Sequence, residues 1–209
     1  MHPTHINPRR EKYDKIRVDA KKDAEVDLDY NFSRVEEDSL KAATKEILEE
    51  HLSGNKYLDL NGDMLETPAV MLSGSWGGSE DYVLLPTRKQ SALQIYTGDF
   101  IPNLLHELGH MVKGQEDNSS MKDAIEKIAK EAKIEANKSE HAEASPSPDK
   151  WEEEVRADLT GVHIRWLAGA NPTKVEYEML ADEPADVSHP PGTYRIARIA
   201  AYLKKLASN

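Results

Sequence analysis

One stretch, from residue 101 to residue 114, constrains the fold of this chain more than any other; it reads I-P-N-L-L-H-E-L-G-H-M-V-K-G. Its apolar residues recur three or four positions apart, which is the spacing of one face of an α-helix. They are Ile101, Leu104, Leu105, Leu108, Met111 and Val112. Pro102 suits the first turn of a helix, and Gly114 suits the position just past its end. The stretch therefore predicts a helix with one buried face.

Two histidines and a glutamate on this predicted helix are candidate residues of a metal site. His106 and His110 are four residues apart, so they project from the same side. Two imidazoles so placed can bind one zinc ion, and Glu107 between them can take a proton from a zinc-bound water. The alternative is a helix with two incidental histidines and a surface glutamate. Motifs elsewhere in the chain are needed to distinguish the metal site from this alternative.

Composition narrows the classes of protein and of site. The net charge of −11 argues against nucleic acid or an anionic membrane as partner. Because the chain has no cysteine, a metal has to be held by histidines and carboxylates, and no disulfide or cysteine nucleophile is available. The length of 209 residues favours a single domain, predicted here as 36–209, preceded by a polar N-terminal arm, 1–35.

No apolar run in the sequence approaches the length of a bilayer span, and the N-terminus has no apolar signal segment. The sequence therefore predicts a soluble, cytoplasmic protein, with secretion without a cleaved signal peptide left open. His2 and His5 are interpreted as solvated tail residues.

The first half of the chain predicts a helix-and-sheet layer. One helix is expected at 12–24, and an amphipathic helix is expected to begin near Glu36 and to end at Gly54. Short apolar runs separated by turn residues predict strands at 57–60, 69–72, 82–85 and 93–96. A small antiparallel or mixed sheet is the expected result.

Two further segments of this region are candidate binding elements. The loop 73–79 is rich in glycine and serine, but it fits no phosphate-loop spacing, so a hairpin tip is favoured. A strand beside the metal helix could offer its free edge to an extended peptide. The segment 82–87, with Tyr82, Val83 and Leu84, is the candidate for substrate binding.

The second half of the chain predicts helices. An amphipathic helix is expected at 119–138, followed by a loop at 139–150 in which His141 is interpreted as a surface residue. The next helix begins near Pro148. Its predicted buried face consists of Trp151, Val155, Leu159, Val162 and Trp166.

Glu154 and Asp158 fall within that same apolar face, four residues apart. Carboxylates that point into a core are costly unless a cation or hydrogen-bond donors meet them. Glu154 can therefore be a third zinc ligand, and Asp158 can accept the free ring N–H of a ligating histidine. Glu152 and Glu153 are alternative ligands, and pairing of Glu154 in a surface network is the alternative without metal. His163 lies off this face and is interpreted as structural.

The last helix is preceded by the sequence V-S-H-P-P-G-T-Y-R-I. His189, just before that helix, could donate a hydrogen bond to an oxyanion formed at the metal. Arg195 on its first turn could anchor Asp158, another carboxylate or the substrate backbone. Without the metal site, this segment is only a helix-entry loop.

Three segments, taken in order, resemble one known group: H-E-L-G-H at 106–110, E-V-R-A-D-L-T-G at 154–161 and S-H-P-P-G-T-Y-R-I at 188–196. The chain is similar to gluzincin zinc metallopeptidases of the HtpX-type and CAAX prenyl-protease family. The resemblance spans roughly residues 100–205. It implies one Zn²⁺ bound by His106, His110 and Glu154, with Glu107 as base. It also implies Asp158 as the partner of a ligand histidine, and His189 and Arg195 as a later active-site pair.

The chain departs from that family in having no transmembrane helices, so the resemblance implies no lipidated or membrane-protein substrate. The expected fold is α+β and zincin-like, with a small mixed sheet and flanking helix followed by active-site helices. The expected activity is zinc-dependent hydrolysis of peptide bonds in a protein or peptide substrate. The alternatives are a zinc-stabilised regulatory or interaction protein on a peptidase scaffold, and a narrow-specificity protease toxin or effector.

Overall fold

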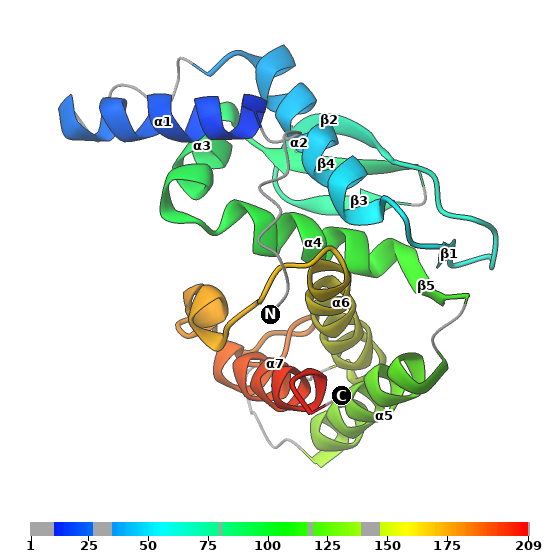
Figure 1. Cartoon of the computed structure of the whole chain (residues 1–209). Helices are drawn as coiled ribbons and strands as arrows, with labels where there is room; N and C mark the ends of the chain where they lie inside the picture. The colour runs from blue at the N-terminus through cyan, green and yellow to red at the C-terminus, as the bar shows by residue number, and fades with distance from the viewer. Residues whose placement is uncertain (1–10, 27–34, 80, 117–118, 139–146, 209) are drawn as a thin grey trace.

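The computed structural model describes residues 11–26, 35–79, 81–116, 119–138 and 147–208, and it has an α+β fold (Figure 1). His2, His5 and His141 lie outside the described residues. In chain order the elements are α1 (Glu11–Val26), α2 (Glu37–Leu52), β1 (Tyr57–Asp59), β2 (Ala69–Gly74), β3 (Gly77–Ser79), β4 (Tyr82–Pro86), α3 (Arg88–Thr97), α4 (Phe100–Met111), β5 (Val112–Gln115), α5 (Ser119–Lys138), α6 (Pro148–Leu167), the 3₁₀ helix η3 (Lys174–Leu180) and α7 (Gly192–Leu206).

The mixed sheet expected in the first half of the chain is present as three strands in the order β2-β4-β3. Strand β2 runs parallel to β4, and β3 runs antiparallel to it. Val83 and Leu85 on β4 are fully buried and share one apolar core with α1, α2, α3 and α4. The predicted helix at 12–24 is confirmed as α1, which packs against α2 and α3 with Tyr13 and Ile16 buried.

The strand expected at 93–96 is wrong, because this segment belongs to helix α3. Thr87 begins the helix with a capping box that it forms with Gln90, and Gly98 ends it in the left-handed conformation, with φ of +96°. Only one face of α3 is buried, through Ser91, Ala92 and Ile95, which is a helical spacing rather than the alternation of a strand.

The expectation that Tyr82, Val83 and Leu84 offer a free strand edge to a substrate is also wrong. They lie on β4, the middle strand of the sheet, and both edges of β4 are already paired, to β2 and to β3. The strand next to helix α4 is instead β3. The sequence does not predict this strand, because Gly77 and Gly78 have low strand propensity and the glycine- and serine-rich segment 73–79 favours a hairpin tip.

Helix α4 lies between the sheet layer and a second layer of helices made by α5, α6, η3 and α7 (Figure 1). It ends at Met111, and the chain continues directly into β5, which pairs antiparallel with β1. Gly114 is therefore a strand residue opposite Leu58, not the residue that ends the helix. The second layer has its own apolar core, with Val155, Leu159 and Val162 of α6 at its centre.

Helices α4 and α6 pack together at two glycines. A Cβ atom on Gly109 would lie 2.2 Å from the carbonyl oxygen of Ala157, and one on Gly161 would lie 2.6 Å from that of Leu105. Only glycine allows backbones to approach this closely. The contact brings the histidines of α4 and the carboxylates of α6 to one place.

Among the described residues, no helix combines the length and the apolar character that a membrane span requires.

Candidate metal centre

His106 and His110 of α4 and Glu154 of α6 form a cluster that could hold a metal ion. The two Nε2 atoms of the histidines are 3.1 Å apart. Oε2 of Glu154 lies 3.3 Å from Nε2 of His106, and its Oε1 lies 3.5 Å from Nε2 of His110. The carboxylate therefore faces both imidazoles at once, and each of the three side chains directs a ligand atom to a common point.

Two observations fit a cation at this point. Ligands about 2.0–2.1 Å from a tetrahedral ion are separated from one another by about 3.3 Å, which is close to the spacing of the three ligand atoms. In addition, Oε2 of Glu154 is buried and accepts no hydrogen bond, and the residue is only 7 % exposed. A buried carboxylate oxygen without a donor is costly, and a cation would remove this cost.

The alternative ligands on α6 are engaged elsewhere. Glu152 is paired with Lys133 at 3.3 Å, and Glu153 accepts a hydrogen bond of 2.9 Å from Lys150. Oε1 of Glu153 lies 3.7 Å from Nδ1 of His110, on the side of the ring that faces away from the cluster. Of these three neighbouring glutamates, Glu154 is the one that the structure brings into the cluster.

Asp158 fixes the orientation of His106. Its Oδ1 lies 2.8 Å from Nδ1 of His106, so the Nε2 atom of that ring is left to face the cluster. Burial disfavours the protonated form of His106, but the Asp158 carboxylate outweighs burial and raises the pKa of His106 to about 10. The pKa of His110 is lowered to about 4, first by burial and then by the charge of His106.

Arg195 holds Asp158 in place from the other side. Its Nε and Nη2 donate to the two oxygens of Asp158 at 2.8 and 2.7 Å, and Nη1 donates to Glu183 at 2.8 Å. Burial raises the pKa of the Asp158 carboxyl, but Arg195 and His106 outweigh burial and hold this pKa below its ordinary range. Arg195 is itself buried, so it supports the site through Asp158 and Glu183.

Glu107 lies beside the cluster, at the wall of a cleft of about 310 Å³. The cleft is also lined by Trp76, Asn103, His106 and His189. Glu107 is 9 % exposed, and burial raises the pKa of its carboxyl above the ordinary value. A carboxylate that is partly shielded from water but open to a cleft can accept a proton from a reactant held there.

His189 lies at the same cleft and is 43 % exposed at its side chain. Asp186 positions it: one carboxylate oxygen accepts hydrogen bonds from the backbone N–H of Ser188 and of His189, at 2.6 and 2.7 Å. The same carboxylate lies 3.1 Å from Nδ1 of His189. Nε2 of His189 is left 3.6 Å from Oε2 of Glu154, so this ring faces the cluster.

Sequence reasoning missed six residues that line the cleft, which are Trp76, Asn103, Leu180, Glu183, Pro184 and Asp186. Asp186 could have been found, because an aspartate in a loop commonly accepts a hydrogen bond from the backbone N–H two residues further on, here that of Ser188. Asn103 lies one turn before His106 and Glu107 on α4, so its place at the cleft follows from helical spacing. Trp76 and Glu183 reach the cleft only through tertiary packing. His163 is buried, with Nδ1 3.2 Å from the hydroxyl of Tyr202, away from the cluster.

Comparisons with known proteins do not assign the chain to a family. No protein-family model matches the sequence, and neither a curated protein nor a solved structure matches the chain.

Proposed function

We propose that this protein is a zinc-dependent endopeptidase with a zincin-like catalytic arrangement, as the resemblance to gluzincins implies. One observation carries the proposal: His106, His110 and Glu154 converge on one point, and the buried carboxylate of Glu107 lies next to them at an open cleft. A purely structural metal site is normally closed by four protein ligands, whereas a catalytic site keeps one position for water or substrate. Three protein ligands beside an open cleft therefore support a catalytic rather than a structural metal site.

Zinc is the metal that this donor set fits best. Two imidazoles and one carboxylate are the ligands of a common class of zinc peptidase sites. When bound in such a site, zinc polarises a carbonyl group and lowers the pKa of a water molecule to about 7. One of the three protein ligands, His106, is held for that role by a chain of contacts. Asp158 accepts from His106, Arg195 donates to Asp158, and Arg195 also donates to Glu183.

Glu107 acts as the general base. Its carboxylate accepts the proton of the attacking water and later returns it to the amine of the leaving peptide. A raised pKa suits both steps, because a base works best when its pKa lies close to the working pH. In its doubly protonated form, His189 donates from Nδ1 to Asp186 and from Nε2 to the oxyanion that forms when water adds to the scissile carbonyl.

Strand β3 is the proposed site for the substrate backbone. It is an edge strand of the three-stranded sheet in the described part of the chain, and it passes directly over α4. A Cβ atom on Gly78 would lie 3.3 Å from the backbone oxygen of Glu107, so the strand lies close to the proposed base. An extended peptide that adds to such an edge through backbone hydrogen bonds would place its carbonyl groups near Glu107.

The test is cleavage of casein and of a peptide library by the zinc-loaded protein and by Glu107→Gln, an isosteric change that removes the base. The proposal predicts cleavage by the wild type and a loss of at least a hundredfold in turnover in the variant, with equal zinc content. Absence of cleavage in both, with one zinc bound, would favour the regulatory protein on a peptidase scaffold. Cleavage of one protein only, found by mapping new N-termini in a proteome, would favour the narrow-specificity effector.

A further inference from the structure

Helix α4 carries four polar residues, and three of them, His106, Glu107 and His110, already have a place in the proposed site. The fourth is Asn103, which lines the same cleft as His106 and Glu107. It precedes His106 by three residues and Glu107 by four, so the three side chains share one face of the helix. The other residues of α4 are apolar side chains, a proline and a glycine.

Neither the helix nor the core requires an asparagine at position 103. Asparagine is a poorer helix former than leucine or alanine. Its side chain here is half-buried, and its carboxamide makes no hydrogen bond within the part of the chain that the structure describes. The backbone N–H donates to Asp99 at 3.2 Å, as the helix demands. The carboxamide, with two N–H donors and one carbonyl acceptor, is therefore available to a ligand in the cleft.

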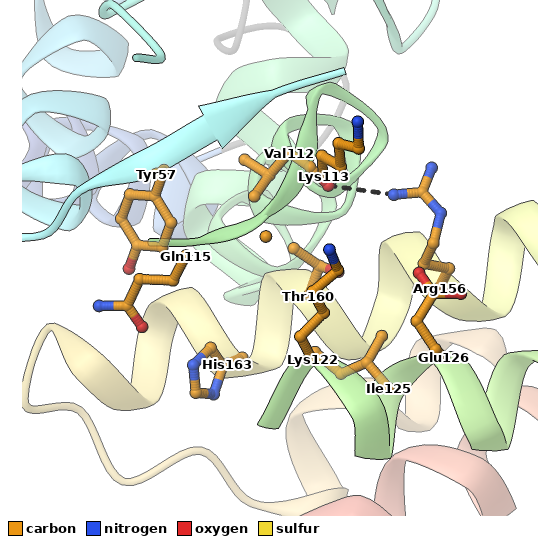
Figure 2. A pocket seen from close by; sticks show the side chains of 11 residues that line it. Tyr57, Val112, Lys113, Gln115, Lys122, Ile125, Glu126, Arg156, Thr160 and His163 are labelled. Atoms are coloured by element: carbon orange, nitrogen blue, oxygen red, sulfur yellow. Dashed lines mark hydrogen bonds between the residues drawn. The ribbon is translucent and has the colours of Figure 1, made fainter. Parts of the chain in front are cut away.

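The cleft has room for a peptide chain, with a volume of about 310 Å³. A second pocket lies between β1, β5, α5 and α6, and Arg156, Thr160 and His163 are among its lining residues (Figure 2). Its volume is about 20 Å³, which is room for about one water molecule. Of these two spaces, only the cleft beside Glu107 and Asn103 can take an extended substrate.

Strand β3 runs along α4 in roughly the same direction. Trp76, just before β3, packs against Phe100 in the first turn of α4, with ring centroids 5.3 Å apart. Two residues further on, a Cβ atom on Gly78 would lie 3.3 Å from the backbone oxygen of Glu107. A peptide that adds to the edge of β3, as proposed above, would therefore follow α4 and pass both Asn103 and Glu107.

The spacing along α4 determines which part of the substrate Asn103 meets. Four helix residues span about 6 Å, and an extended peptide rises about 3.3 Å per residue. With its scissile carbonyl at Glu107, the substrate therefore has a peptide group about two residues away beside Asn103. A strand that is paired along one edge keeps the N–H and C=O groups of alternate residues on its other edge. If these groups are buried without a partner, binding is weakened.

We infer that Asn103 is a substrate-binding residue whose carboxamide forms hydrogen bonds with a backbone peptide group about two residues from the scissile bond. The inference rests on the proposed peptidase function. A carboxamide can accept from the N–H and donate to the C=O of a peptide group, so it recognises an extended backbone whatever the side chains are. The substrate class is therefore an extended peptide segment of mixed sequence, with at least about three residues on the side of Asn103.

The test uses the casein fragment that the wild-type protein cleaves fastest. Its affinity is measured by calorimetry for zinc-loaded Glu107→Gln, with and without Asn103→Leu, so that binding is observed without turnover. The leucine keeps the branched shape and removes the carboxamide. It should raise the dissociation constant about tenfold. With Glu107 intact, Asn103→Leu should raise the Michaelis constant by a similar factor and leave kcat and the zinc content unchanged. Asn137→Leu, the same change on the exposed face of α5, should alter none of these quantities.

Ester analogues of the fragment locate the contact. In each analogue an oxygen atom replaces one backbone N–H, at three positions on either side of the scissile bond. One analogue, about two residues from that bond, should lose about tenfold in affinity for the protein with Asn103 and nothing further for Asn103→Leu. Analogues that lack an N–H paired with β3 should lose affinity equally for both proteins.

Three results would overturn the inference and leave the proposed function intact. In each of them the wild type cleaves the fragment. The first is an unchanged affinity in Asn103→Leu. The second is a set of ester analogues that all lose affinity equally in both proteins. The third is a loss in Asn103→Leu that Asn103→Ala does not share, since it would come from the bulk of leucine. Absence of any cleavage by the wild type would overturn the proposed function, and this inference with it.

Discussion

Gly109 and Ala157 are in direct backbone contact where α4 crosses α6, and a methyl group on Gly109 would lie 2.2 Å from the Ala157 carbonyl oxygen. Gly161 makes the reciprocal contact with Leu105. These two contacts set how closely the helices approach, and therefore how close His106 comes to Glu154. Gly109, the one glycine of the H-E-L-G-H segment, therefore shapes the site although it carries no functional group.

Gly109→Ala should disturb both stability and metal binding. The added methyl group meets backbone atoms, which cannot rotate away, so the helices have to separate. Overpacking of this kind typically costs about 1–3 kcal/mol or more. Urea unfolding measures the loss of stability, and zinc titration measures the affinity, which should fall with it. Gly77→Ala is the control, because its new methyl group would meet only side-chain atoms of Leu84, the nearest at 3.4 Å. Equal behaviour of the two variants would contradict this account of the helix crossing.

The ligand set gives the second prediction. His106→Ala, His110→Ala and Glu154→Ala should each lose most of the bound zinc, because a site with three protein ligands rarely tolerates the loss of one. Glu107→Gln should retain it. Metal analysis of the purified variants is the measurement.

Glu153→Ala is the control for the position of the ligand on α6, because Glu153 is next to Glu154 in sequence and pairs with Lys150 instead. It should bind one equivalent of zinc. If Glu153→Ala lost the metal and Glu154→Ala retained it, the assignment of the third ligand would be wrong.

The helices that carry the site could be predicted from the sequence because each has a strong apolar period. Phe100–Met111 and Pro148–Leu167 are such helices, and the structure confirms both within a few residues. The prediction of a strand at 93–96 was wrong because it took the apolar residues of this segment as buried, whereas Leu93 and Tyr96 are exposed. The capping pair Thr87 and Gln90 was a better signal there than hydrophobicity.

The pairing of site residues from distant segments was less accessible to sequence reasoning. Asp158 could be assigned to a ligand histidine because a carboxylate on an apolar helix face needs a partner. Nothing local connects Glu183 to Arg195, which meet only because the chain before α7 folds back on itself, with Gly192 donating to the carbonyl oxygen of Glu183. The order of the strands, which leaves β3 beside α4, likewise depends on tertiary packing.

His189 and Asp186 give the third prediction. His189→Ala should lower turnover by about 100- to 1,000-fold, because it removes a donor to an oxyanion present only in the transition state. The Michaelis constant and the zinc content should change little. A variant with full zinc and wild-type turnover would remove His189 from the mechanism.

Asp186→Asn should have a smaller effect of the same kind, since Asp186 does not contact the substrate but orients the ring of His189. Turnover should therefore fall in Asp186→Asn while the Michaelis constant and the zinc content stay unchanged. Steady-state kinetics, with zinc quantified in each sample, is the measurement. Wild-type turnover in Asp186→Asn would show that Asp186 only supports the loop.

The last prediction concerns protons released when zinc binds. In the metal-free protein at pH 7.5, His106 carries two ring protons because Asp158 raises its pKa to about 10, while His110, with a pKa of about 4, is neutral. A ligand imidazole has to be neutral, so zinc binding displaces one proton from His106. The apparent affinity should accordingly rise as the pH increases toward 10, and this contribution should disappear above that pH.

Asp158→Asn isolates the contribution of His106. Without the carboxylate, burial lowers the pKa of His106, so the ring is already neutral at pH 7.5 and zinc binding should release about one proton fewer than in the wild type. Protons from a metal-bound water occur in both proteins and cancel in the difference. The measurement is calorimetry in two buffers of different ionisation enthalpy, with circular dichroism to check that the variant is folded. Equal proton release in both proteins would mean that Asp158 does not control the protonation of His106, and that the hydrogen bond between them only orients the ring.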